Sequence, residues 1–116
     1  MTSPTPPLSP TDFHVLLVLA AESLYGYAIQ KAVREESQGS VSPEIGSLYR
    51  VLARLVTAGF VEEVTAPEGS EESPRGRPRR YYGITRDGRV VLEADIARIE
   101  GAMTLARERL GTAGHP

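Results

Sequence analysis

Apolar residues follow a helical spacing in the first part of the chain. The nearly continuous apolar run at residues 13–21 comes directly after residues 9–12 (Ser-Pro-Thr-Asp), whose serine, proline and acid are typical of a helix N-terminus. These features predict a buried first helix that ends near Glu22 or Ser23. Residues 24–27 (Leu-Tyr-Gly-Tyr) are expected to open a second, amphipathic helix that stops before Gly39.

A third helix is predicted over residues 43–58. Residues 42–44 (Ser-Pro-Glu) repeat the N-terminal cap pattern, and Gly59 followed by Phe60 is typical of a left-handed helix end with a hydrophobic residue after it. The apolar positions between these ends recur at spacings of 3, 4, 3 and 1 residues: Ile45, Leu48, Leu52, Leu55 and Val56.

The periodicity changes after the third helix. Residues 60–65 are rich in β-branched side chains, residues 66–78 are dominated by Pro, Gly, Ser and Glu, and residues 79–84 are strand-like again. We therefore expect two short antiparallel strands joined by a long loop. At most one of Tyr81 and Tyr82 should reach the surface if the second strand alternates.

A long last helix is predicted over residues 86–110, with Thr85 as its N-cap. Its apolar positions alternate spacings of 4 and 3 residues: Leu92, Ile96, Ile99, Met103, Ala106 and Leu110. The expected fold class is therefore mainly α with a small β-hairpin. Three short helices followed by a hairpin is the order of a winged helix-turn-helix, in which the third helix enters a DNA major groove and the hairpin touches the flanking backbone.

Composition narrows the function. The chain has 116 residues, enough for one compact domain, and no cysteine, which excludes disulfides and thiolate chemistry and fits a reducing cytoplasm. Neither His14 nor His115 has a visible carboxylate partner, and no glycine-rich phosphate loop is present, so we expect no enzyme, no metal and no cofactor. The longest apolar run, at residues 15–21, is too short to cross a bilayer. We expect a cytoplasmic protein.

The formal net charge of −2 conceals a strongly polarised segment. Residues 62–72 carry five glutamates and no basic residue, whereas residues 75–89 carry six arginines and one aspartate. Four of these arginines lie within residues 75–80, where they repel one another unless they face anions, stay solvated in a mobile loop or pair with the glutamates. Charge alone leaves these three alternatives open.

The third helix and the hairpin together form a candidate DNA-contact surface. Ser47, Arg50 and Arg54 lie three and four residues apart, which stacks them on one side of the third helix beside Tyr49. Their hydroxyl and guanidinium groups can reach phosphates or base edges, although a solvated helix face would have the same pattern. The candidate DNA-binding residues are Ser47, Tyr49, Arg50, Arg54, Arg75, Arg77, Arg79 and Arg80.

Several of these motifs together resemble the PadR family of transcriptional regulators. They are residues 45–49 (Ile-Gly-Ser-Leu-Tyr), residues 58–61 (Ala-Gly-Phe-Val), residues 77–82 (Arg-Pro-Arg-Arg-Tyr-Tyr) and the second-helix opening at residues 24–27. The likeness extends from about residue 13 to residue 92, and the short chain resembles the subgroup with a single C-terminal helix. Many members have a proline after the motif tyrosine, where this chain has Arg50, a further candidate for contact with a phosphate or a base.

The resemblance implies a homodimeric winged-helix repressor that binds a promoter palindrome. Matched residue by residue, Ser47 and Tyr49 correspond to positions of the third helix that approach DNA, and Arg77, Arg79 and Arg80 correspond to the basic wing. The resemblance also implies a small aromatic effector that binds near the dimer interface, as in some members. This chain departs from the members with a tryptophan-sandwiched drug site, because it contains no tryptophan.

The apolar seam of the last helix is expected to pack against a second copy of the chain, with the first helix contributing. The predicted interface residues are Phe13, Leu16, Leu17, Leu92, Ile96, Ile99, Met103 and Leu110. The alternative is that the last helix folds back on its own domain. The expected organisation is a disordered arm at residues 1–9, a winged helix-turn-helix domain at 10–85, a dimerisation helix at 86–111 and a disordered tail at 112–116.

Two functions fit these observations. The first is a sequence-specific DNA-binding repressor that acts as a homodimer on an inverted-repeat operator. The alternative is a winged-helix dimer that serves as a protein-interaction scaffold and whose arginines meet an acidic partner. Only the first requires that the third helix and the hairpin act together on DNA.

Overall fold

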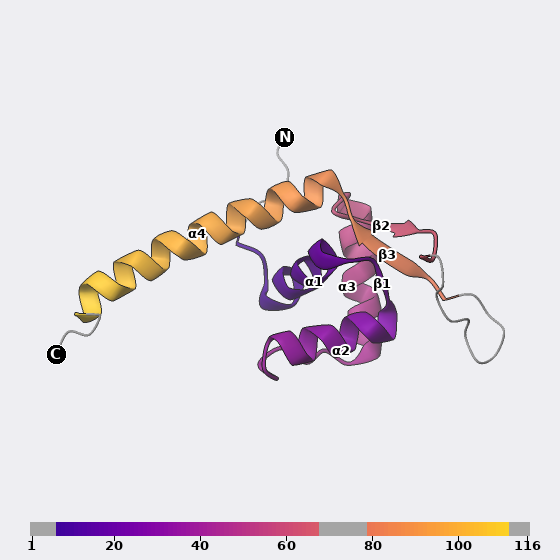
Figure 1. The fold of residues 1–116 in the computed structure, drawn as a ribbon, viewed down its shortest axis with the longest axis horizontal. Helices are drawn as coiled ribbons and strands as arrows, with labels where there is room; N and C mark the ends of the chain where they lie inside the picture. The colour runs from indigo at the N-terminus through magenta and orange to yellow at the C-terminus, as the bar shows by residue number, and fades with distance from the viewer. Residues whose placement is uncertain (1–6, 68–78, 112–116) are drawn as a thin grey trace.

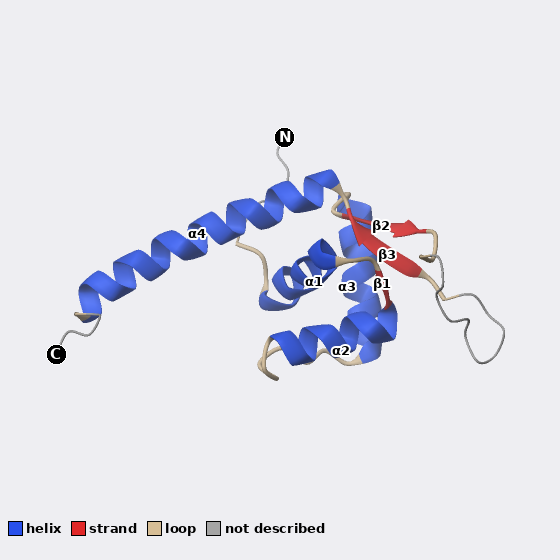
Figure 2. Cartoon of the chain, in the orientation of Figure 1, coloured by secondary structure: helices blue, strands red, loops and turns tan. Residues whose placement is uncertain are grey.

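The computed structural model describes residues 7–67 and 79–111 (Figure 1). The elements follow in the order α1 (Pro10–Ala21), β1 (Leu24–Tyr25), α2 (Gly26–Glu36), α3 (Ile45–Ala58), β2 (Val61–Val64), β3 (Tyr81–Ile84) and α4 (Arg86–Leu110). Figure 2 shows the predicted fold class, helices with one small antiparallel sheet. Most of the predicted arm, most of the predicted loop with Arg75 and Arg77, and the predicted tail lie outside the described residues.

Helix α1 begins where the sequence predicts and lies at the centre of the domain. The side chain of Ser9 accepts a hydrogen bond from the Asp12 backbone N–H at 3.1 Å, and Pro10 occupies the first helical position. The helix contacts α2, α3, α4 and β3, and its residues Val15 and Leu16 are fully buried. Because neighbours cover most of its circumference, α1 can be almost continuously apolar.

Helix α3 begins later than predicted. Ser42 does not cap it; the N-cap residue is Glu44, whose backbone is extended and whose side chain makes no capping hydrogen bond. The segment before the helix is held against α2, because the Gln30 side-chain amide donates to the Pro43 carbonyl at 3.0 Å. The predicted C-terminal end is confirmed, since Gly59 is left-handed with φ of 87° and its N–H and that of Phe60 bond to the last turn.

The sheet has a strand that the sequence analysis missed. Leu24 and Tyr25 form β1, which pairs with β3, so that β3 lies between β1 and β2. The prediction that residues 24–27 open a helix is wrong for the first two of them, because a two-residue strand has no periodicity to recognise and its partner is distant in sequence. As the central strand, β3 buries both Tyr81 and Tyr82, in agreement with the expectation that at most one of them reaches the surface.

Helix α4 starts inside the domain and leaves it. Thr85 caps the helix as predicted, accepting from the Gly88 N–H at 3.0 Å and donating to the Gly59 carbonyl at 2.6 Å. The first turns pack on α1, whereas every residue from Glu100 to Leu110 is exposed, and Figure 1 shows this half of the helix extending away from the other elements. Among the described helices, none combines the length and the apolar character needed to span a membrane.

Candidate nucleic-acid interface

Two arginines on α3 have different partners. Arg50 is exposed and donates to the Ser47 hydroxyl at 3.1 Å, its single hydrogen bond within the described parts of the chain. Arg54, one turn later, donates through both terminal nitrogens to the two carboxylate oxygens of Asp12 on α1, at 2.8 Å each. These hydrogen bonds raise the pKa of the Arg54 guanidinium above its ordinary value. Arg50 therefore points to solvent, while Arg54 already has a charged partner.

Asp12 is the residue that the sequence analysis missed at this place. It was assigned only to the N-terminus of α1, yet it is buried and receives the bidentate ion pair from α3. The predicted exposure of Arg54 is correct, since 57% of its side chain is accessible. No sequence signal links Asp12 to Arg54, because the two helices that carry them meet only in the folded domain.

Tyr49 lies across the start of α2. A β-carbon added at Gly26, the first residue of α2, would clash with the hydroxyl and ring atoms of Tyr49, so the glycine makes room for the tyrosine. Partial burial raises the pKa of Tyr49, with the nearby phenols of Tyr82 and Tyr27 adding to the shift and Arg80 opposing it. The hydroxyl therefore stays protonated at neutral pH and can donate a hydrogen bond.

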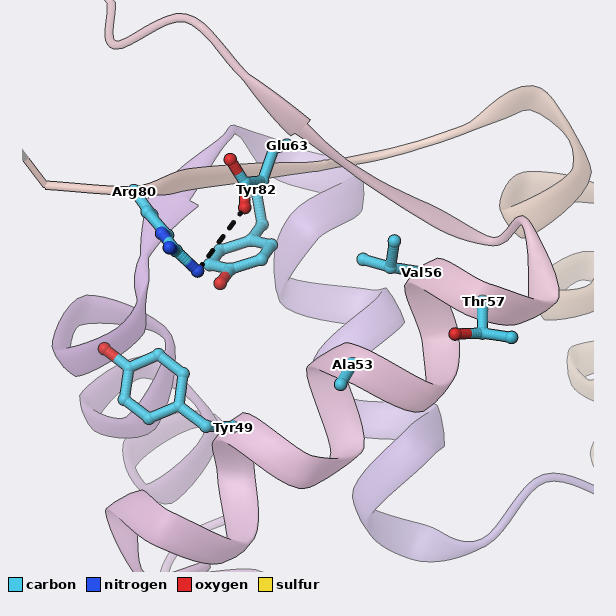
Figure 3. A pocket seen from close by; sticks show the side chains of 7 residues that line it. All are labelled: Tyr49, Ala53, Val56, Thr57, Glu63, Arg80 and Tyr82. Atoms are coloured by element: carbon cyan, nitrogen blue, oxygen red, sulfur yellow. Dashed lines mark ion pairs between the residues drawn. The ribbon is translucent and has the colours of Figure 1, made fainter.

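A hollow of about 510 Å³ separates α3 from the wing, by which we mean β2 and β3 with the described residues beside them, 65–67 and 79–80. We call this hollow the helix–wing groove. Figure 3 shows its lining, which comes from α3 on one side and from the strands on the other: Tyr49, Ala53, Val56, Thr57, Glu63, Arg80 and Tyr82. Arg80 Nη1 lies 3.7 Å from Glu63 Oε2, and both side chains are largely exposed, so this ion pair is worth roughly 0–1 kcal/mol and Arg80 can exchange partners.

The two described wing arginines occupy different environments. Arg79 stacks over the ring of Tyr25 in β1, with its guanidinium carbon 4.2 Å from the ring centroid. Tyr25 in turn packs edge to face on Tyr81 at 5.5 Å. Arg80 instead lines the helix–wing groove beside α3. The wing therefore presents one guanidinium over β1 and one toward α3.

The predicted dimer residues divide into two groups. Leu16 and Leu92 are 0% and 5% exposed in the hydrophobic core of the single chain, so they offer almost no surface to a second copy. The others remain at least partly accessible on α1 and α4, with Met103 44% and Leu110 84% exposed. We call this accessible set the α1–α4 seam: Phe13, Leu17, Ile96, Ile99, Met103 and Leu110.

The described residues contain no group of three or more histidine, cysteine, aspartate or glutamate side chains arranged to hold a metal ion. His14 lies in α1 with its ring edge to face on Phe13 at 5.4 Å. Three acidic side chains in the described part of the chain, Asp12, Glu63 and Asp95, each form an ion pair with one arginine.

The chain is similar to solved transcriptional regulators. Residues 15–94 match the family model for the transcriptional regulator PadR-like family. A PadR family transcription regulator from Clostridium difficile is 27% identical, with a TM-score of 0.70 over 89% of this chain and 100% of that chain. A PadR-like regulator from Bacillus cereus is 24% identical, with a TM-score of 0.68 over 88% and 92% of the two chains. Bacillus subtilis PadR, solved in complex with operator DNA, is 24% identical, with a TM-score of 0.57 over 71% and 44%.

A further relative is a 37.1 kDa protein in transposon TN4556 of Streptomyces fradiae, which is 38% identical over 90 residues. The match covers 75% of this chain, but the chain spans only 23% of the length of that protein. The family match, in contrast, runs from α1 into α4 and includes α3 and the wing strands. The chain belongs to the PadR-like family of transcriptional regulators.

Proposed function

We propose that this chain is a sequence-specific DNA-binding repressor that acts as a homodimer on an inverted-repeat operator. The observation that carries the proposal is the position of Arg50 and Tyr49 on the outer face of α3, with Arg80 across the helix–wing groove. In a winged helix-turn-helix this arrangement puts α3 in the major groove and the wing on the flanking backbone. Bacillus subtilis PadR, which has a similar fold, was solved with operator DNA.

The side chains on this surface suit different parts of DNA. Arg50 bonds only to Ser47 within the described chain, so its fork can turn to a guanine edge or a phosphate. The protonated hydroxyl of Tyr49 can donate to a phosphate oxygen. Arg79 and Arg80 are suited to phosphates, which give affinity without sequence information. Arg75 and Arg77, outside the described residues, are proposed to extend this phosphate contact.

The homodimer is proposed to form through the α1–α4 seam. The exposed half of α4 carries Met103 and Leu110, and it continues the stripe that Ile96 and Ile99 begin beside α1. A second copy packed on this stripe would remove these side chains from water, which is the main source of stability in such interfaces. The two-fold symmetry then requires the two α3 helices to enter successive major grooves, about 34 Å apart.

Release by a small aromatic effector is the remaining part of the proposal. On α1 the ring of the seam residue Phe13 pairs with that of its neighbour His14, and a flat ligand that inserts there would change the separation of the two α3 helices. Thermal-shift measurements with small aromatic acids test this part separately. A panel that produces no shift at millimolar concentration would remove the effector from the proposal.

Binding of the protein to its own promoter region tests the DNA-binding function. We expect Arg50→Ala to relax sequence preference or weaken binding. In contrast, Arg79→Ala and Arg80→Ala should each weaken binding to all sequences and lower the salt slope by about one unit per lost phosphate contact. Fluorescence anisotropy over a range of salt concentrations measures both effects. A protein-interaction scaffold would show neither of them.

A further inference from the structure

Two buried acids connect α1 to helices on either side of it. Asp95 on α4 is 1% exposed and accepts from the Leu8 backbone N–H at 3.4 Å and from Arg98 Nε at 3.0 Å. Asp12, at the other end of the same short segment, accepts the bidentate pair from Arg54 on α3. Because Ser9 caps α1 between them, residues 8–12 form one continuous polar connection from α4 to α3. We call this connection the α1 link.

The α1 link joins the two surfaces on which the proposed function depends. Its α4 end lies beside Ile96, and Phe13 follows Asp12 directly, so the link borders the α1–α4 seam at Asp95 and at Asp12. Its α3 end lies one helical turn after Arg50 on the proposed DNA-reading helix. In a dimer formed through the seam, the α1 link would hold α3 at a fixed distance and orientation from the two-fold axis.

We propose that Asp12, Arg54 and Asp95 are positioning residues that fix α3 relative to the dimer seam and thereby determine which half-site spacing the protein accepts. This inference rests on the proposed DNA-binding dimer. The bidentate geometry supports it, because two parallel hydrogen bonds restrict the orientation as well as the distance of the two helices. Burial of Asp12 and Asp95 supports it too, because a buried carboxylate that loses its partner is strongly disfavoured.

The competing role for Arg54 is direct contact with DNA, since its side chain is 57% exposed. The two roles predict opposite effects of a change at Asp12. If Arg54 contacts phosphate, Asp12→Asn releases the guanidinium and strengthens DNA binding with a steeper salt dependence. If Arg54 is a positioning residue, Asp12→Asn and Arg54→Gln cause the same loss of discrimination between half-site spacings. The double variant then loses no more discrimination than either single variant.

The experiment measures anisotropy with a set of operators whose half-sites are moved apart or together by one base pair. The wild-type protein should lose affinity by about tenfold or more on each altered operator, a penalty comparable to that of a mismatched base pair. Arg54→Gln, Asp12→Asn and Asp95→Asn should reduce this penalty to about twofold. Circular dichroism checks that each variant is folded, and Arg54→Gln, at an exposed side chain, carries the test alone if a buried acid cannot be replaced.

Matched controls come from exposed charges outside the proposed DNA-contact residues. Arg34→Gln removes an exposed arginine from α2, and Glu93→Gln removes an exposed acid from α4; both should keep the wild-type spacing penalty. Two results would overturn the inference: an unchanged spacing penalty in Arg54→Gln, or tighter and more salt-dependent binding by Asp12→Asn. A wild-type protein that binds none of the operators would contradict the proposed function instead.

Discussion

Helices α3 and α4 carry apolar stripes of the same helical spacing, yet the domain covers the central part of the α3 stripe and leaves half of the α4 stripe in solvent. Leu48 and Leu52 are fully buried and Leu55 is 2% exposed, whereas Val56 at the end of the α3 stripe reaches the surface, with 39% exposed. The stripe of α4 begins equally buried at Leu92, but Met103 and Leu110 lie in solvent. The 25 residues of α4 extend about 37 Å, so the helix continues beyond the elements that could cover it.

The periodicity of apolar residues therefore shows which face of a helix is removed from water, but not whether the same chain or another molecule packs on it. On α3 the rest of the domain covers the central part of the stripe, so the opposite face, with Tyr49 and Arg50, remains for a partner. On the distal half of α4 the stripe itself remains, so the proposed partner is a second copy of the chain. Substitutions in one stripe and not the other test whether the two stripes are packed differently.

The largest effect is expected at the centre of the α3 stripe. Leu52→Ala should lower the free energy of unfolding by about 2–5 kcal/mol, because it leaves a cavity in a closely packed core. Leu105→Ala, at an exposed position of α4, should change it by about 0.5 kcal/mol or less. Urea unfolding measures both. Equal effects of the two substitutions would show that the distal part of α4 is as well packed as α3.

A charge in the α1–α4 seam should come next. Met103→Glu should weaken dimerisation by about thirtyfold or more, as expected when a charge enters the centre of an apolar interface, without unfolding the domain. Sedimentation equilibrium at micromolar concentration measures the change. Val90→Glu, at a 59% exposed position on another side of α4, is the matched control and should leave the mass unchanged. A dimer that withstands Met103→Glu would contradict the proposal that the two copies associate through the α1–α4 seam.

The smallest of the three effects concerns the outer face of α3. Gly26→Ala should destabilise the domain by about 1–3 kcal/mol, because the new methyl group clashes with Tyr49 and must displace it. Gly46→Ala, in the first turn of α3, has no atom within 4 Å of the new β-carbon and should keep or raise stability. Thermal unfolding compares the pair. A tolerated Gly26→Ala would mean that Tyr49 does not depend on this space.

Much of the fold could be predicted from the sequence because most elements carry local signals. The serine cap of α1, the glycine end of α3 and the threonine cap of α4 are each formed by residues close together in the chain. Strand β1 has no such signal, since two residues show no period and the pairing of Leu24 with Tyr82 forms only in the folded sheet. The burial of both tyrosines of β3 follows from that same long-range pairing.

The sequence was sufficient to predict which residues lie at the candidate site, but not which side chains they bind in the folded domain. The sequence placed Arg50 and Arg54 on one side of α3, and nothing in their spacing distinguishes them. The distinction comes from Asp12, which lies on another helix and binds only Arg54. In the same way, the sequence predicts an apolar stripe on α4 but not which of its residues a single chain buries. The burial of Leu16 and Leu92 in the core depends on how α1 and α4 pack, which no local pattern encodes.

Selection of binding sequences from a random double-stranded DNA library, with the purified full chain at low salt, is the decisive test of a DNA-binding homodimer. We expect an enriched inverted repeat whose half-site centres lie about one helical turn apart, as two α3 helices related by a two-fold axis require. A library with no enriched sequence, or an enriched single half-site without its inverted copy, would contradict it.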